Sequence, residues 1–202
     1  KLSTILPDFH QVSVRYEQFK KSLSEASKER KEIAKELIDS SKKHINEMLH
    51  LDEANNEKKI PKRVIHGDTK ISNILFSKSH SYLCMIDTDI VMGGFVHYDF
   101  GDAIRTICNM TDEDSTNLST IEFNMEYFKQ YTKGFLQEVK EIVSLAEIKY
   151  LPLSVKAMPF LMGLRFLTDF LDNDKYYKTT YANHNLDRAR NQYTLVVKIK
   201  IS

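Results

Sequence analysis

Three side chains suited to phosphoryl transfer occur close together in this sequence. Residues 66–73 read HGDTKISN, so Asp68 precedes Asn73 at the spacing D-x₄-N. Apolar, strand-like runs flank this segment, and Asp87 directly follows a further apolar run, residues 83–86. Phosphoryl transfer to a hydroxyl requires a carboxylate that takes the hydroxyl proton, and oxygen ligands that hold Mg²⁺ against the nucleotide phosphates. The sequence therefore predicts such a site between the two runs.

The spacing of this segment assigns a role to each side chain. His-x-Asp-x₄-Asn is the spacing of the kinase catalytic loop, with Gly67 where protein kinases carry Arg. We predict that Asp68 is the catalytic base, because a carboxylate can orient a hydroxyl and accept its proton. We predict that Asn73 and Asp87 are the Mg²⁺ ligands. The alternative is a simple turn, since Asp, Gly and Asn are common in turns.

Other polar residues near this segment have predicted supporting roles. We expect His66 to brace the loop instead of acting as an acid or base. Asp89 follows Asp87 by two residues and would point the same way along an extended backbone. Asp99, Asp102 and Arg105 lie within about one helical turn, and we expect them to brace the catalytic loop through ion pairs.

Composition excludes several classes of function. The chain has 202 residues, 42% hydrophobic and 28% charged, with a formal net charge of +1. This charge gives no electrostatic basis for binding nucleic acid or a membrane surface. No apolar run approaches the ~20 residues of a membrane span. We expect a reduced, cytoplasmic protein in which Cys84 and Cys108 are both buried. The sequence leaves the oligomeric state open.

The hydrophobic pattern predicts a mainly α fold with a small β-hairpin region, an α+β class. Apolar residues recur at helical spacing over 14–51, with a break near residues 40–41 or earlier. Residues 52–62 are predicted to be a loop, and residues 63–92 to hold the catalytic loop and a hairpin with strands 74–76 and 82–86. Further helices are predicted at 99–109, 121–139, 145–171 and 186–199, the third broken at Pro152 or Pro159. Ser144 and Glu147 form a predicted capping box, and Asn183 or Asn185 could cap the last helix.

The motifs together resemble those of the aminoglycoside phosphotransferase and choline kinase superfamily. The segments that carry the resemblance are HGDTKISN (66–73), IDTD (86–89) and YDFGDAIR (98–105). Two later segments, GLRFLTD (163–169) and HNLDRARNQ (184–192), are most similar to the N-acetylhexosamine 1-kinase branch. The resemblance implies the C-terminal lobe of a protein-kinase-like fold, with ATP as phosphoryl donor and Mg²⁺ as cofactor.

The same resemblance implies an acceptor and its contacts. It points to phosphorylation of a small sugar or alcohol, most of all the anomeric hydroxyl of an N-acetylhexosamine. By this resemblance, Arg165 and Tyr176 line the sugar pocket, and Lys70 approaches the γ-phosphate. Thr69 and Asp89 are further candidates for substrate contact. Asp169, one turn beyond Arg165, could pair with it.

One feature of such kinases is not found in the sequence. The phosphates of ATP are normally covered by a glycine-rich loop, with a Lys on a neighbouring strand. The six glycines form no such loop, and none precedes Gly67. We therefore expect residues 1–202 to be one C-terminal lobe whose N-terminal lobe is missing, and to be inactive alone.

Several alternatives remain open at this stage. The acceptor could be an aminoglycoside, choline, homoserine or another sugar. A cationic acceptor is mildly disfavoured, because residues 158–192 contain several basic side chains. A non-catalytic kinase-like scaffold is a further alternative, against which the intact set of Asp68, Asn73 and Asp87 argues. No activation segment of the protein-kinase type follows Asp87.

Overall fold

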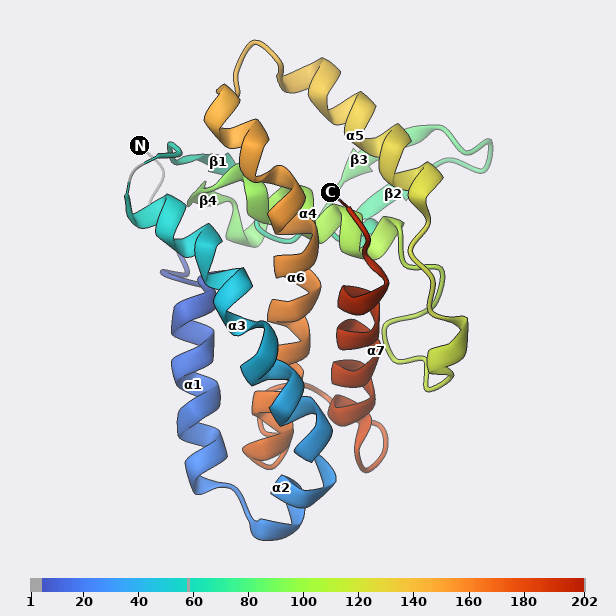
Figure 1. Cartoon of the computed structure of the whole chain (residues 1–202). Helices are drawn as coiled ribbons and strands as arrows, with labels where there is room; N and C mark the ends of the chain where they lie inside the picture. The colour runs from blue at the N-terminus through green and yellow to red at the C-terminus, as the bar shows by residue number, and fades with distance from the viewer. Residues whose placement is uncertain (1–4, 58, 202) are drawn as a thin grey trace.

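A long central helix organises the structure, a computed structural model that describes residues 5–57 and 59–201. This helix, α6, packs against α1, α3, α4 and α7, which come from distant parts of the chain (Figure 1). The α-helices within the described residues are α1 (Val12–Glu25), α2 (Lys28–Ile33), α3 (Lys35–Asn56), α4 (Val96–Ile107), α5 (Met125–Val139), α6 (Leu145–Leu171) and α7 (His184–Lys198). The predicted, mainly α class is confirmed.

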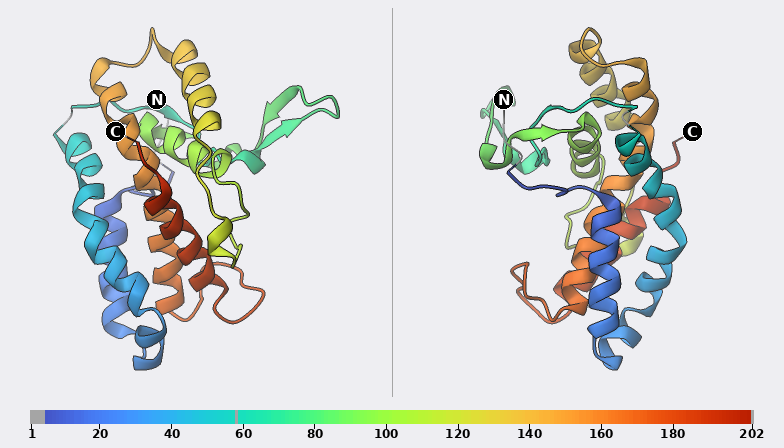
Figure 2. Two further views of the ribbon diagram at one scale, coloured as in Figure 1. Left: turned by 45° about the vertical axis from the view of Figure 1, so that its right-hand side comes forward. Right: turned by 90° about the vertical axis from the view of Figure 1, so that its left-hand side faces the viewer.

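Four short strands form two separate antiparallel pairs. Strand β1 (Arg63–Ile65) pairs with β4 (Met92–Gly94), and β2 (Ile74–Phe76) pairs with β3 (Tyr82–Met85). The β2–β3 hairpin, as predicted, joins its strands through residues 77–81, and Figure 2 shows it extending away from the helices. Three short 3₁₀ helices lie at Ile71–Asn73, Thr88–Ile90 and Leu118–Thr120.

The β1–β4 pair was not predicted from the sequence. Gly93 and Gly94 stand opposite Val64 and Arg63. A Cβ atom on Gly94 would lie 2.3 Å from the Cδ1 atom of Ile65, so any other residue would require the Ile65 side chain to shift. These glycines therefore belong to a strand that lies beside the start of the catalytic loop.

The N-terminal helices differ in detail from the predicted 14–51 segment. The chain breaks at Ser27, whose hydroxyl accepts the backbone N–H of Arg30, and again at Ala34. No break occurs at residues 40–41, because Ser41 lies buried inside α3 and bonds to Tyr193 of α7 at 2.7 Å.

The predicted loop at 52–62 is also partly wrong, because α3 continues to Asn56. The side chain of Asp52 explains why the helix extends beyond residue 51. Its buried carboxylate accepts the backbone N–H groups of Val12 and Ser13 at 3.2 and 2.7 Å, and so binds the first residues of α1. An extra helical turn in α3 thus satisfies donors that the start of α1 leaves unpaired.

Helix α6 runs unbroken through Pro152 and Pro159, so the predicted break is wrong. Packing against α1, α2, α3, α4 and α7 holds the segment helical despite the missing N–H groups. The predicted capping box of Ser144 and Glu147 is confirmed. Glu147 is buried and also forms a bidentate ion pair with Arg63 of β1, at 2.6 and 2.8 Å.

Two smaller predictions also fail. Asn183 precedes α7 in the left-handed conformation, and its side chain makes no capping bond. Cys108 is buried as predicted, but Cys84 is exposed because it lies on the projecting hairpin.

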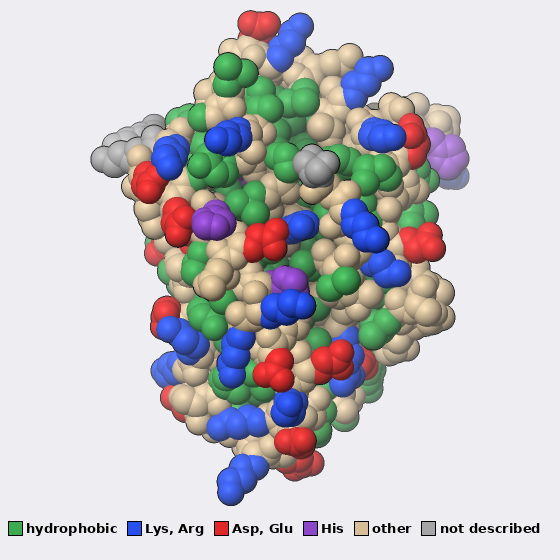
Figure 3. Space-filling view, in the orientation of Figure 1, with side chains coloured by type: hydrophobic (Ala, Val, Ile, Leu, Met, Phe, Trp, Pro, Cys, Tyr) green, Lys and Arg blue, Asp and Glu red, His purple; other side chains and the backbone are tan. Residues whose placement is uncertain are grey.

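Figure 3 shows acidic and basic side chains mixed over one face of the molecule, in agreement with the net charge of +1. None of the helices in the described part of the chain combines the length and the apolar character that a membrane span requires.

The contact between α4 and α6 yields a stability prediction. A Cβ atom on Gly101 would lie 2.5 Å from both the carbonyl oxygen of Ser154 and the Cγ atom of Met158. We expect Gly101→Ala to destabilise the protein by about 1–3 kcal/mol, because overpacking outweighs the better helix propensity of Ala. Chemical denaturation measures the difference.

Gly134→Ala is the matched control, because a Cβ atom on Gly134 in α5 would meet nothing within 4 Å. This variant should gain up to about 1 kcal/mol of stability through helix propensity. Equal effects of the two substitutions would contradict the close approach of α4 to α6.

Candidate active site

The predicted catalytic loop, residues 66–73, is held in place by a carboxylate of helix α4. The two Asp99 oxygens accept the backbone N–H groups of His66 and Gly67 at 2.7 and 2.8 Å. Burial raises the pKa of Asp99, and these two bonds act in the opposite direction. Gly67 has a φ of +85°, which a side chain would disfavour. The predicted bracing role of Asp99 is thus seen as hydrogen bonds to the backbone.

Asp68 is joined to two other predicted site residues. Its Oδ2 atom lies 2.6 Å from Lys70 Nζ and 2.9 Å from Asn73 Nδ2. Asn73 Nδ2 also donates to the backbone carbonyl of Asp68 at 2.9 Å. The loop thereby closes on itself and fixes the carboxylate of Asp68 relative to the amide of Asn73.

His66 braces this loop, as predicted. Its Nδ1 atom accepts the backbone N–H of Asp68 at 3.3 Å, so its Nε2–H donates to the carbonyl of Ile86, 3.1 Å away. The imidazole therefore joins the catalytic loop to the residue before Asp87.

Asn73 and Asp87 are neighbours with a donor set suited to Mg²⁺. The backbone N–H of Ile86 donates to the carbonyl of Asn73 at 2.9 Å, which brings the next residue, Asp87, beside Asn73. Because the Asn73 amide nitrogen is turned to Asp68, its oxygen remains available as a neutral ligand. Asp87 has an exposed side chain and a strained, left-handed backbone with φ of +63°. An amide oxygen beside a carboxylate fits a cation that prefers oxygen ligands.

Two predicted substrate contacts lie elsewhere than expected. Asp89 does not follow Asp87 along an extended backbone, because residues Thr88–Ile90 form a 3₁₀ turn. Thr69 is buried, and its hydroxyl donates to the carbonyl of Asp99 at 2.6 Å. Both lie outside the lining of the pocket that contains Asp68.

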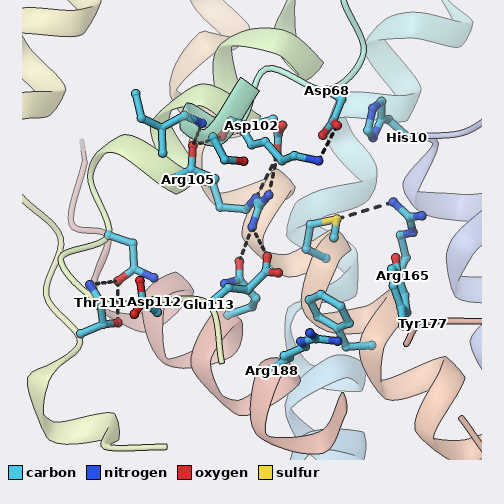
Figure 4. A pocket seen from close by; sticks show the side chains of 18 of the residues that line it. His10, Asp68, Asp102, Arg105, Thr111, Asp112, Glu113, Arg165, Tyr177 and Arg188 are labelled. Carbon is cyan, nitrogen blue, oxygen red and sulfur yellow. Dashed lines mark hydrogen bonds and ion pairs between the residues drawn. The ribbon is translucent and has the colours of Figure 1, made fainter. Parts of the chain in front are cut away.

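A cavity of about 510 Å³ opens beside Asp68 and is named here the Asp68 pocket. Its walls come from the N-terminal segment, the catalytic loop, α4, the loop after α4, α6 and α7 (Figure 4). The polar and charged residues that line it are His10, Asp68, Lys70, Ser72, Asp102, Arg105, Thr106, Asn109, Thr111, Asp112, Glu113, Arg165, Tyr177, Arg188 and Gln192.

A buried arginine forms one wall of the Asp68 pocket. Arg105 bonds to Asp102 at 2.8 Å and to Glu113 at 2.5 Å, with the Gln192 side-chain oxygen 3.4 Å away. Burial lowers the pKa of Arg105, but the two carboxylates more than offset this effect, so the net shift is upward. The loop after α4 therefore contributes Glu113 to the pocket.

Arg165 lines the Asp68 pocket as predicted, whereas Tyr176 does not. The Tyr176 side chain is 71% exposed and lines a second cavity between α1 and α6, which Arg165 also borders. Asp169 does not pair with Arg165. Its carboxylate accepts the backbone N–H groups of Tyr176 and Tyr177 at 2.8 and 2.9 Å, and Tyr177 reaches the Asp68 pocket instead.

Sequence reasoning missed His10. Its Nε2 atom lies 2.8 Å from the carbonyl of Gly67, and its ring is buried beside Phe9 and Tyr98. Burial lowers the pKa of His10 from 6.5 to about 4, against smaller opposing effects of the Gly67 bond and the Asp102 charge. The only local signal was a His in the polar segment before a predicted helix, which does not reveal a contact 57 residues away.

The neutral, buried His10 predicts a pH-dependent stability. Between about pH 6.5 and 4 the unfolded chain takes up a proton that the folded chain does not, so stability falls as the pH falls. From pH 7 to 5 the wild type should lose about 2 kcal/mol more than His10→Gln, which has no titrating ring. Urea titrations at several pH values measure this difference; parallel curves would contradict it.

The profile of the phosphotransferase enzyme family matches residues 2–138. The matched part includes His10, the catalytic loop, Asp87 and Asp99, and it covers more than half of the chain. The chain therefore belongs to the phosphotransferase enzyme family, whose members transfer phosphoryl groups to small molecules.

Proposed function

We propose that this protein is an ATP- and Mg²⁺-dependent kinase that phosphorylates a hydroxyl group of a small molecule. The first candidate for this molecule is a sugar. The observation that carries this proposal is the hydrogen-bonded pair of Asp68 and Asn73 beside the Asp68 pocket, with Asp87 next to Ile86, whose backbone N–H bonds to Asn73. Asp68 is the one member of the set that also lines the pocket. A hydroxyl held there would be within reach of its carboxylate.

In this proposal each side chain has a distinct task. Asp68 orients the attacking hydroxyl and accepts its proton. Asn73 and Asp87 would hold Mg²⁺, which supplies charge neutralisation for the phosphoryl group in transfer. Lys70, 2.6 Å from Asp68, is close enough to the reacting centre to meet a γ-phosphate oxygen. Asp99 holds the loop in place without touching substrate.

The charges of the Asp68 pocket favour a neutral acceptor. Its lining contains four acids, Asp68, Asp102, Asp112 and Glu113, and four bases, Lys70, Arg105, Arg165 and Arg188. These formal charges cancel, whereas an aminoglycoside or choline calls for an excess of acids. A neutral polyhydroxylated compound fits this balance. The similarity of 163–169 and 184–192 to the N-acetylhexosamine 1-kinase branch makes an N-acetylhexosamine our first candidate.

We further propose that residues 1–202 act as the C-terminal lobe of a two-lobed kinase. Support comes from the apolar side chains exposed along β1 and the β2–β3 hairpin, beside the catalytic loop. The exposed fractions of Val64, Phe76, Tyr82 and Leu83 are 69%, 51%, 64% and 58%. Exposed apolar surface of this kind is typical of a contact with another folded unit.

The first test is a screen for ADP release by the full-length protein with N-acetylhexosamines, neutral sugars, choline and aminoglycosides. With the best acceptor, Asp68→Asn should lower kcat by about 10²–10⁴, because the proton acceptor is lost. Asp39→Asn is the control, since Asp39 is an exposed residue of α3 that, among the described residues, forms an ion pair with Lys35 alone. A kcat for Asp68→Asn equal to that of the control would refute the role of Asp68.

Asp87→Asn tests the proposed metal ligand. Asn tolerates the left-handed backbone of this position, so the fold should persist while one negative charge is lost. We expect turnover to fall about 1,000-fold or more, because the metal supplies several kcal/mol of transition-state stabilisation. Partial rescue at high Mg²⁺ would support direct ligation. Wild-type kcat and wild-type Mg²⁺ dependence would show that the metal is held by other residues.

A further inference from the structure

Unpaired polar atoms are concentrated at the Asp68 pocket. Among the described residues, eight buried side-chain nitrogen or oxygen atoms have no hydrogen-bond partner. Four of the eight belong to residues that line this one pocket. They are His10 Nδ1, Asp102 Oδ2, Tyr177 Oη and Arg188 Nε. A buried polar atom without a partner costs free energy, so such a concentration indicates a place where a polar ligand supplies the missing bonds.

Two of the four atoms are acceptors. Because His10 is neutral and its Nε2–H donates to the carbonyl of Gly67, its Nδ1 atom carries a lone pair. Asp102 is only 4% exposed, and its Oδ1 atom takes both bonds from Arg105, at 2.9 and 2.8 Å. Its Oδ2 atom therefore has acceptor capacity that no described residue fills.

His10 and Asp102 line the same cavity, although they belong to different elements. His10 comes from the segment before α1, and Asp102 from α4, yet both line the pocket. Figure 4 shows Asp68 and Asp102 at the same side of the pocket, with Arg105 between Asp102 and Glu113. A ligand in this cavity would meet two acceptors close to the proposed catalytic base.

We propose that Asp102 and His10 bind the polyhydroxylated substrate and determine specificity for it. Asp102 Oδ2 and His10 Nδ1 each accept a hydrogen bond from one of its hydroxyl groups. These hydroxyl groups are different from the one presented to Asp68. This inference rests on the proposed function for the role of Asp68, but its own content is the pair of hydroxyl contacts. Tyr177 and Arg188 supply hydrogen-bond donors for the oxygen atoms of the substrate. A compound that both donates and accepts hydrogen bonds therefore fits the pocket. An ammonium group would satisfy the two acceptors but not these two donors.

The test measures binding of N-acetylglucosamine and its monodeoxy analogues to the full-length protein by titration calorimetry without nucleotide. Asp102→Asn keeps an oxygen for Arg105 but removes the charged acceptor, and it should weaken binding at least tenfold, about 1.4 kcal/mol. His10→Gln keeps a donor for the Gly67 carbonyl and removes the Nδ1 acceptor, so it should also weaken binding. At least one deoxy analogue should bind the wild type more weakly than N-acetylglucosamine does. Its affinity should not fall further in Asp102→Asn.

Kinetics separate this role from a structural one. The KM for the sugar should rise at least tenfold in Asp102→Asn, while the KM for ATP stays within twofold of the wild type. Wild-type sugar affinity in both variants would overturn the inference, as would a wild-type protein that binds none of the sugars. If Asp102→Asn fails to fold, His10→Gln decides alone. Sugar binding without any turnover would refute the proposed kinase activity and leave the inference standing.

Discussion

The site depends on one half-buried carboxylate, that of Asp99 in α4, which holds the backbone of a separate loop. Asp99 accepts the N–H groups of His66 and Gly67, and its own carbonyl accepts the Thr69 hydroxyl. Burial of a carboxylate is unfavourable unless hydrogen bonds compensate, and here two strong backbone donors do so. A loop with a left-handed Gly67 would otherwise be mobile. The geometry of Asp68 and Asn73 is therefore set by a helix that follows them in the sequence.

Helix α4 can fix the loop only because α4 is itself fixed. Gly101, two residues beyond Asp99, lets α4 approach the backbone of α6 at Ser154. Helix α6 in turn packs against α1, α3 and α7. The same helix carries Arg165 into the Asp68 pocket, and α7 carries Arg188 there. One close helix contact thus determines both the position of the loop and the opposite wall of the pocket.

The parts of the structure that could be predicted are those encoded by neighbouring residues. The hairpin and the capping box of Ser144 are local, so spacing and residue type were sufficient. The contact of His10 with Gly67 and the ion pair of Glu113 with Arg105 were missed, because they join separate elements. Prolines in α6 were misjudged for the opposite reason, since packing outweighed a local preference. Half of the pocket was therefore not apparent from the sequence.

The buried charges of Asp102 and Arg105 are better explained by recognition than by stability. The desolvation of a buried ion pair offsets much of its attraction, and apolar residues of similar volume often serve stability equally well. Apolar residues in place of Asp102 and Arg105 would, however, remove a hydrogen-bond acceptor from this wall of the Asp68 pocket. Arg105 satisfies one oxygen of Asp102 and leaves the other unpaired at the pocket wall. In our proposal, this unpaired oxygen is the one that a hydroxyl group of the substrate meets.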